Sequence, residues 1–222
     1  IIITHFHEDH IRGMTEIIQK AHPKASICLP DALTTCEALS YYVALDVLNG
    51  YDSISKVKEM ISVLEYLDKN QRYPIRINQN KLIFENNNHV ITALSPSDYD
   101  SYLANKKFMA EVANTPKCFF SASKENPNHF CIAISIQNKN SGKCILLGGD
   151  LEVCDNDNSG WTSALSSIKA PSQRSIEVFK VPHHGSDTAY HIDTWENYVI
   201  KDALAILTTF SSSALPREEY IE

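Results

Sequence analysis

Long apolar runs are missing from this sequence, and so are the other marks of membrane or repeat proteins. No run approaches the roughly 20 apolar residues of a membrane-spanning helix. No charged segment followed by an apolar one opens the chain, as it would in a secretory signal, and no internal repeat or low-complexity tract occurs. We therefore expect no membrane segment in this chain.

The sequence also lacks an excess of positive charge. It has 20 Lys and Arg against 27 Asp and Glu, which gives a net charge of −7. This balance argues against the broad phosphate-binding surface that dominates non-specific DNA affinity. The net charge does not exclude a local basic patch.

No C-x-x-C pair is present among the cysteines. Most of them lie in apolar surroundings, so we predict small buried thiols rather than metal ligands. A reducing cytoplasm is the simplest compartment for such thiols, although an even count would allow disulfides in a secreted protein. The six are Cys28, Cys36, Cys118, Cys131, Cys144 and Cys154.

The start of the sequence carries a dense group of potential metal ligands. His5, His7, Asp9 and His10 fall within six positions, directly after the apolar residues 1–3. On an extended segment alternate side chains share a face, so His5 and His7 can hold one ion. Asp9 and His10 can hold a second where the chain turns into a helix. Imidazole and carboxylate ligands suit zinc, manganese or iron.

Two later apolar strands end in side chains of the same kind. Residues 144–147 are followed by two glycines and Asp150, and residues 178–181 are followed by the pair His183 and His184. Strand ends are where α/β folds assemble their sites. We therefore expect Asp150, His183 and His184 to belong to a metal site as well.

Together the three segments resemble the metallo-β-lactamase superfamily. The pattern H-x-H-x-D-H at residues 5–10 matches its signature. The order and spacing, with KVPHHGS at residues 180–186, are similar to the subgroup of the competence (DNA-uptake) channel domains and the phosphorylcholine esterases. The resemblance covers essentially the whole chain and implies one α/β domain over residues 1–222, an αββα sandwich. The 43% hydrophobic composition can supply its core.

That family usually places further strands before the first motif. The chain starts on the motif strand without Met. We therefore expect its N-terminal strands, with any targeting signal they carried, or a partner subunit to lie outside this sequence. Residues 216–222 likewise resemble the start of a helix that is cut short.

The resemblance also implies roles for the ligands. His5 and His7 would hold the first metal, Asp9 and His10 the second, and Asp150 would bridge the two. Asp9 would in addition face the nucleophile and orient its proton. Two cations about 3.5–4 Å apart can share a hydroxide, lower the pKa of its parent water to roughly 7 and polarise a phosphoryl or carbonyl oxygen.

The paired histidines cannot share one role on a strand. Adjacent strand residues point to opposite faces, so we predict His184 as a ligand of the second metal and His183 as a phosphate contact or general acid. Lys180, just before the pair, supports an anionic substrate or is simply an outward-facing strand residue.

Other histidines and one carboxylate leave alternatives open. His129 lies where the family has a histidine that completes the first metal site, but competence-type relatives have no ligand there, so both interpretations stay open. Glu152 can hydrogen-bond a ligand or a substrate, although an exposed loop position is favoured. We expect three histidines without motif context to lie on the surface: His22, His89 and His191.

Periodicity predicts a mixed order of helices and strands. Helices are expected over residues 11–22, 31–50, 53–69, 99–113, 161–168 and 192–199. Strands are expected over residues 26–29, 81–85, 89–94, 130–137, 143–147, 178–181 and 203–210. The helices of residues 31–50 and 53–69 are expected to form an outer layer rather than a cap over the site.

Three functions remain at this point, because fold alone does not decide substrate. The first is a metal-dependent phosphodiesterase or nuclease with two divalent metals, zinc first and manganese or iron as alternatives. Its substrate would be an anionic small molecule or a nucleic acid. The second is a lactonase or β-lactamase-like acyl hydrolase. The third is a non-catalytic metal-binding scaffold. Its expected mark is eroded ligands, whereas here every ligand of the core set is intact, with only the third-motif histidine left open.

Overall fold

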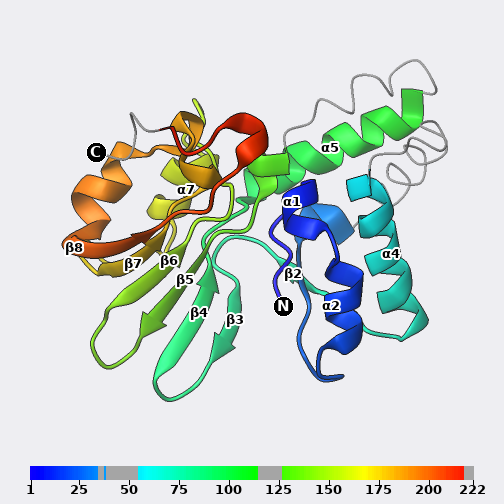
Figure 1. The fold of residues 1–222 in the computed structure, drawn as a ribbon, viewed down its shortest axis with the longest axis horizontal. Helices are drawn as coiled ribbons and strands as arrows, with labels where there is room; N and C mark the ends of the chain where they lie inside the picture. The colour runs from blue at the N-terminus through cyan, green and yellow to red at the C-terminus, as the bar shows by residue number, and fades with distance from the viewer. Residues whose placement is uncertain (35–37, 39–54, 115–126, 218–222) are drawn as a thin grey trace. The chain divides into compact units, whose positions relative to one another are not determined.

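The computed structural model is a mixed α/β structure and describes residues 1–34, 38, 55–114 and 127–217 (Figure 1). Contacts divide the chain into two compact units. The first unit contains residues 1–77 and 101–127, and the second contains residues 78–100 and 128–222.

The first unit is built on a short parallel pair of strands. Strand β1 (Cys28–Pro30) pairs with β2 (Ile75–Ile77), and Ile2 forms a parallel bridge to Cys28. Strand β1 overlaps only the end of the strand expected over residues 26–29, and residues 1–3 contribute an isolated bridge rather than a full strand. Strand β2 was not predicted. Its three residues are too few to show an alternating pattern.

Two short helices replace the helix expected over residues 11–22. Helix α1 (Glu8–Ile11) ends before Gly13, and α2 (Met14–Lys20) begins after it. Gly13 has φ +77°, a left-handed conformation that glycine adopts without steric cost. The apolar spacing continues through both helices, but Gly13 interrupts the hydrogen-bond ladder in the middle of the predicted helix.

Helix α4 (Ser55–Lys69) confirms the helix expected over residues 53–69. It contacts α1 and α2 and buries Met60, Val63 and Leu67. This packing is that of an ordinary covering helix within the first unit. The 3₁₀ turn Asp31–Thr34 is what the structure describes of the helix expected over residues 31–50, and most of the rest lies outside the described residues.

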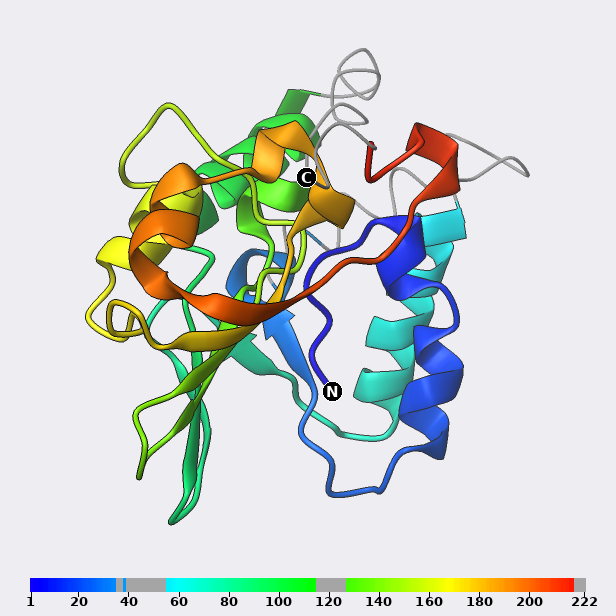
Figure 2. The same cartoon turned by 60° about the vertical axis from the view of Figure 1, so that its left-hand side comes forward.

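The second unit holds a six-stranded mixed sheet, in the order β3-β4-β5-β6-β7-β8 (Figures 1 and 2). Pairing is antiparallel from β3 to β6 and parallel from β6 to β8. The strands are β3 (Leu82–Glu85), β4 (His89–Ala93), β5 (Ile134–Asn138), β6 (Cys144–Leu147), β7 (Ile176–Lys180) and β8 (Val199–Ile206). Strands β3 and β4 form one antiparallel hairpin, and β5 and β6 form another.

Several boundaries in this part of the chain differ from expectation. Residues 127–130 form a 3₁₀ turn, Pro127–Phe130, so β5 starts later than predicted. A π-helical turn, Thr194–Tyr198, stands where a helix was expected over residues 192–199. Strand β8 starts directly after that turn, four residues before the predicted start at 203. Helices α5 (Asp98–Asn114) and α7 (Gly160–Ser166) agree with prediction.

One face of the sheet carries the core of the second unit. Helix α7 places Trp161 against Phe179 of β7, with ring centroids 6.0 Å apart, and Trp195 packs on the same ring at 5.0 Å. Leu146 and Leu165 are buried in the same cluster. Such edge-to-face aromatic contacts add to the free energy gained by burial.

The other face carries a row of apolar side chains, one from each strand and in register across the sheet. Several members are well exposed, Leu204 at 60% and Phe84 at 49%. The row consists of Phe84, Ile91, Ile136, Ile145, Val178 and Leu204. Exposed apolar patches of this kind mark surfaces that another element or partner covers.

Four cysteines can be placed, and all are free thiols. Cys28, Cys131 and Cys144 are buried, as predicted, and Cys154 is half-buried. Burial raises the pKa of the Cys144 thiol to about 12, so it stays protonated and inert. Cys36 and Cys118 lie outside the described residues. Within the described ranges no helix has the length and apolar character that crossing a membrane requires.

Candidate metal centre

The first unit gathers its histidines in the loop between Ile3 and helix α1. The buried ring of His5 lies 4.7 Å from that of His7 and 4.3 Å from that of His10, centroid to centroid. The Thr4 hydroxyl lies 3.1 Å from His5 Nδ1 and 3.5 Å from His10 Nδ1. Three imidazoles are thus held together by a six-residue segment, as the sequence predicts.

The ring nitrogens of this cluster lie at distances that suit a shared metal ion. His5 Nε2 is 3.0 Å from His7 Nδ1. With Zn–N bonds of about 2.0–2.1 Å in a tetrahedral site, two nitrogen ligands of one ion stand roughly 3.4 Å apart. The two nitrogens need to separate only slightly to admit an ion between them, so His5 and His7 fit a metal of this type.

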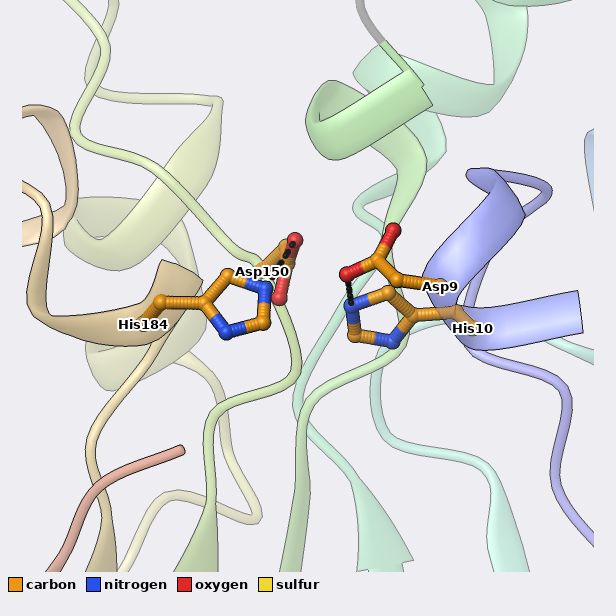
Figure 3. A group of neighbouring side chains, drawn as sticks. All are labelled: Asp9, His10, Asp150 and His184. Carbon is orange, nitrogen blue, oxygen red and sulfur yellow. Dashed lines mark ion pairs between the residues drawn. The ribbon is translucent and has the colours of Figure 1, made fainter. Parts of the chain in front are cut away.

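Asp9 and His10 form the second pair, on helix α1. Asp9 Oδ2 lies 3.2 Å from His10 Nε2, the contact drawn as a dashed line in Figure 3. His7 is the N-cap residue of this helix, with extended backbone (φ −67°, ψ 149°), so the chain turns between the two pairs. This turn is the one predicted from the sequence.

The second unit holds Asp150 just beyond the end of β6. The two glycines before Asp150, Gly148 and Gly149, let the backbone pass close to neighbouring residues. A Cβ on Gly148 would stand 2.9 Å from Pro182 Cβ and 3.1 Å from Lys180 O, and Gly149 has φ +55°. The chain therefore turns sharply against the end of β7 and leaves Asp150 only 2% exposed. The Asp150 N–H donates to Cys131 Sγ at 3.1 Å.

His184 is oriented by contacts on both sides of its ring. Its Nδ1 lies 3.0 Å from Thr208 Oγ1, and its ring stacks on Phe210 with centroids 5.0 Å apart and planes at 22°. Its Nε2 is then directed to Asp150 Oδ2 at 4.0 Å (Figure 3). A contact at one ring nitrogen fixes the orientation of the ring and leaves the other nitrogen available as a ligand. The predicted ligands Asp150 and His184 are thus brought together.

The backbone of the paired histidines corrects one premise of the prediction. Both lie beyond β7, in the 3₁₀ turn His183–Gly185, not on the strand. His183 has φ +46°, His184 has φ +55° and Gly185 has φ +77°. Left-handed backbone is costly for histidine and persists where the surroundings impose it, often at functional sites. The His183 N–H donates to Gly149 O at 3.0 Å, which ties this turn to the loop of Asp150.

His183 points to a different partner, Glu152. Its Nδ1 is 2.9 Å from Glu152 Oε1, and the same carboxylate accepts hydrogen bonds from Asn128 Nδ2 at 3.2 Å and Thr188 Oγ1 at 3.0 Å. The favoured interpretation of Glu152 as an exposed loop residue is therefore wrong, because only 8% of it is exposed. Different surroundings for the two histidines agree with different roles.

The charge state of Glu152 follows from these contacts. Burial alone would raise the pKa of its carboxyl group, but the hydrogen bonds from His183, Asn128 and Thr188 favour the ionised form, and the net pKa is lowered. An ionised Glu152 fixes the orientation of the His183 ring through this contact.

The remaining histidines lie at exposed or half-buried positions. His129 lies in the turn Pro127–Phe130 with its side chain 49% exposed, and its Nε2 is 3.9 Å from Glu152 Oε2. Its role as a ligand stays a prediction. His22 and His89 are exposed, as expected, whereas His191 is half-buried beside Thr194 Oγ1 at 3.0 Å. Burial lowers the pKa of His191.

Lys180 turns its ammonium group back to the main chain. Its Nζ donates to Val181 O at 2.8 Å. Partial burial lowers its pKa, against the opposing effect of nearby Asp150. Neither sequence interpretation, a support for an anionic substrate or an outward-facing residue, describes this half-buried position fully.

Sequence reasoning missed the residues that hold the ligands in place. Thr208 and Phe210 lie about 25 positions after His184 in the chain, and neither carries a motif. Asn128 and Thr188 gave no signal either. Their roles arise only from packing.

No protein-family model matches this chain, and no curated protein matches it significantly. The motifs and the geometry of the two ligand groups are therefore the features that indicate function.

Proposed function

We propose that this chain is a metal-dependent hydrolase of phosphodiesters that uses two divalent transition metals, zinc first. The observation that carries the proposal is the histidine cluster of the first unit, with ring nitrogens 3.0 Å apart on His5 and His7. Imidazole and carboxylate ligands on the two units form the donor set that such metals prefer. The resemblance supplies the expectation that both sets serve one dinuclear centre.

The residues that would hold the metals are those of the motifs. His5 and His7 would hold one ion, Asp9, His10 and His184 the other, and Asp150 both; His129 is a further candidate. When bound, such a pair lowers the pKa of a water to about 7 and polarises a phosphoryl oxygen.

The protein's own side chains would position the substrate and move its protons. Asp9 would accept and orient the proton of the attacking water. His183 is held at Nδ1 by Glu152, and its Nε2 lies 3.5 Å from Asn128 Nδ2. With a proton on Nε2 it would turn from that contact to a phosphoryl or leaving-group oxygen and donate to it. A donor whose orientation is fixed beforehand loses less entropy in the transition state.

The αββα sandwich belongs to the same proposal. It requires a second sheet against the exposed apolar row from Phe84 to Leu204. The support is that this row runs in register across all six strands of the sheet, as the inner face of a two-sheet sandwich would.

Metal content is the first test of this proposal. The purified chain, reconstituted with zinc or manganese and then desalted, is expected to carry close to two ions per molecule by elemental analysis, because the motif supplies ligands for two. Hydrolysis of bis-(p-nitrophenyl) phosphate should appear with the metal and disappear with a chelator. Binding of no metal would contradict the proposal, and turnover of nitrocefin or a lactone in place of the phosphodiester would reassign the substrate to acyl compounds.

Thr208 offers a second test that leaves every proposed ligand in place. Thr208→Val removes the hydroxyl that lies 3.0 Å from His184 Nδ1. Loss of such a supporting hydrogen bond lowers metal affinity by about 10–100-fold, which a competitive zinc titration would measure. Thr208→Ser should restore the affinity, and Thr209→Val, at the exposed neighbouring position, should leave it unchanged. Equal affinity in Thr208→Val and the parent would show that His184 is not a ligand held in this way.

A further inference from the structure

A cavity in the second unit lies beside the turn that carries the paired histidines. It has a volume of about 680 Å³, within the range of roughly 300–1,000 Å³ that is usual for small-molecule sites. Pro182, Gly185 and Ser186, which flank His183 and His184 in the chain, contribute to its lining. A group bound in this cavity would thus lie beside the turn that carries the proposed proton donor, although neither histidine is among the lining residues.

The histidine turn and the cavity wall are packed tightly against each other. A Cβ on Gly185 would stand 2.8 Å from Leu207 Cδ2 and 3.2 Å from Pro216 Cβ, and Leu207 and Pro216 line the same cavity. The wall beyond β8 therefore helps to hold the turn in its left-handed conformation.

Two aromatic side chains line the cavity. Tyr190 is 59% exposed, so one face of its ring is available to a ligand. Trp195 comes from the π-helical turn and is held in place by its edge-to-face contact with Phe179, at 5.0 Å and 64°. Single π-helical turns occur frequently at functional sites.

The charge of the lining indicates what kind of group it accepts. No Lys or Arg is among its residues, and its charged side chain is Asp187, whose Oδ1 accepts from Thr188 N at 3.0 Å. An anion such as a phosphate would therefore not be held here. A flat uncharged group that stacks on the aromatic rings, with donors for Asp187 and Ser186 at its edge, matches this lining.

We propose that the cavity binds the nucleoside group of the substrate, with its base stacked on Tyr190 and Trp195. The placement of the phosphate next to this cavity rests on the proposed function. Binding of the nucleoside is independent of that function, because every lining residue named above belongs to the second unit and none is a proposed metal ligand.

Equilibrium binding of thymidine to the metal-free chain tests the nucleoside site alone. Calorimetric titration should show saturable binding, and Tyr190→Ala should weaken it about tenfold, as expected for the loss of one stacking ring. Tyr73→Ala removes a tyrosine of the first unit that is 82% exposed and should have no effect. Absence of binding, or equal binding by the parent and Tyr190→Ala, would overturn the proposal, as would binding of choline in place of thymidine.

Steady-state kinetics connect the cavity with catalysis. The p-nitrophenyl ester of thymidine 5′-phosphate and methyl p-nitrophenyl phosphate release the same p-nitrophenolate and differ in the nucleoside. Tyr190→Ala should lower kcat/KM about tenfold for the first ester and leave the second unchanged; an equal loss on both would overturn the proposal. If neither ester is hydrolysed while thymidine binding still depends on Tyr190, the hydrolase proposal fails and the cavity assignment stands.

Discussion

Asp150→Asn is expected to abolish turnover, by roughly 10³-fold or more, while the protein stays folded. Loss of a partner outside the ligand shell already costs about 10–100-fold, and this substitution removes a charge that, by the resemblance, two cations share. The amide is nearly isosteric, and Asp150 N–H keeps its hydrogen bond to Cys131 Sγ, so the loop should retain its conformation. Steady-state hydrolysis of bis-(p-nitrophenyl) phosphate, with circular dichroism as the folding check, measures both.

A matched substitution separates the site from a general effect of charge. Asp157→Asn removes the same charge at an exposed loop position and should keep the parent activity and metal content. Asp150→Asn should in addition lower the number of bound ions below two. Wild-type turnover in the Asp150 variant would show that this carboxylate is not shared by the metals.

The paired histidines should respond to substitution in different ways. His184→Ala is expected to lower metal occupancy at one site, since its imidazole is the group held between Thr208 and Phe210 with Nε2 toward Asp150. His183→Ala should leave occupancy nearly intact and lower kcat by about 10²–10⁴-fold, the usual contribution of a general acid or base. A metal titration and steady-state kinetics on each variant provide the two readouts.

Controls for this pair come from the same unit. His89→Ala, at an exposed position of β4, should change neither occupancy nor kcat. Glu152→Gln removes the charge next to His183 Nδ1 and should reproduce part of the kcat loss without loss of metal. If His183→Ala loses the metal and His184→Ala keeps it, the two assignments must be exchanged.

Local sequence was a good guide to the elements and to the order of the motifs. Strands β3 to β7 and helices α4, α5 and α7 were predicted because their apolar periodicity is a local property that burial of one face preserves. The errors fell where a single residue or a short segment changes the backbone. Gly13 divides a helix whose apolar pattern continues through it, and β2 is too short to carry a pattern.

For the candidate site, too, some features follow from local sequence and others only from tertiary structure. By itself the sequence determined which side chains can bind metal, since residue type and spacing within His5–His10 and around Asp150 and His184 are local facts. Only the tertiary structure decided the environment of each. It bent the chain at the paired histidines, buried Glu152 against His183, and placed Thr208 behind His184. These contacts join segments up to about 30 residues apart, and their free energy comes from packing and desolvation, which no local pattern encodes.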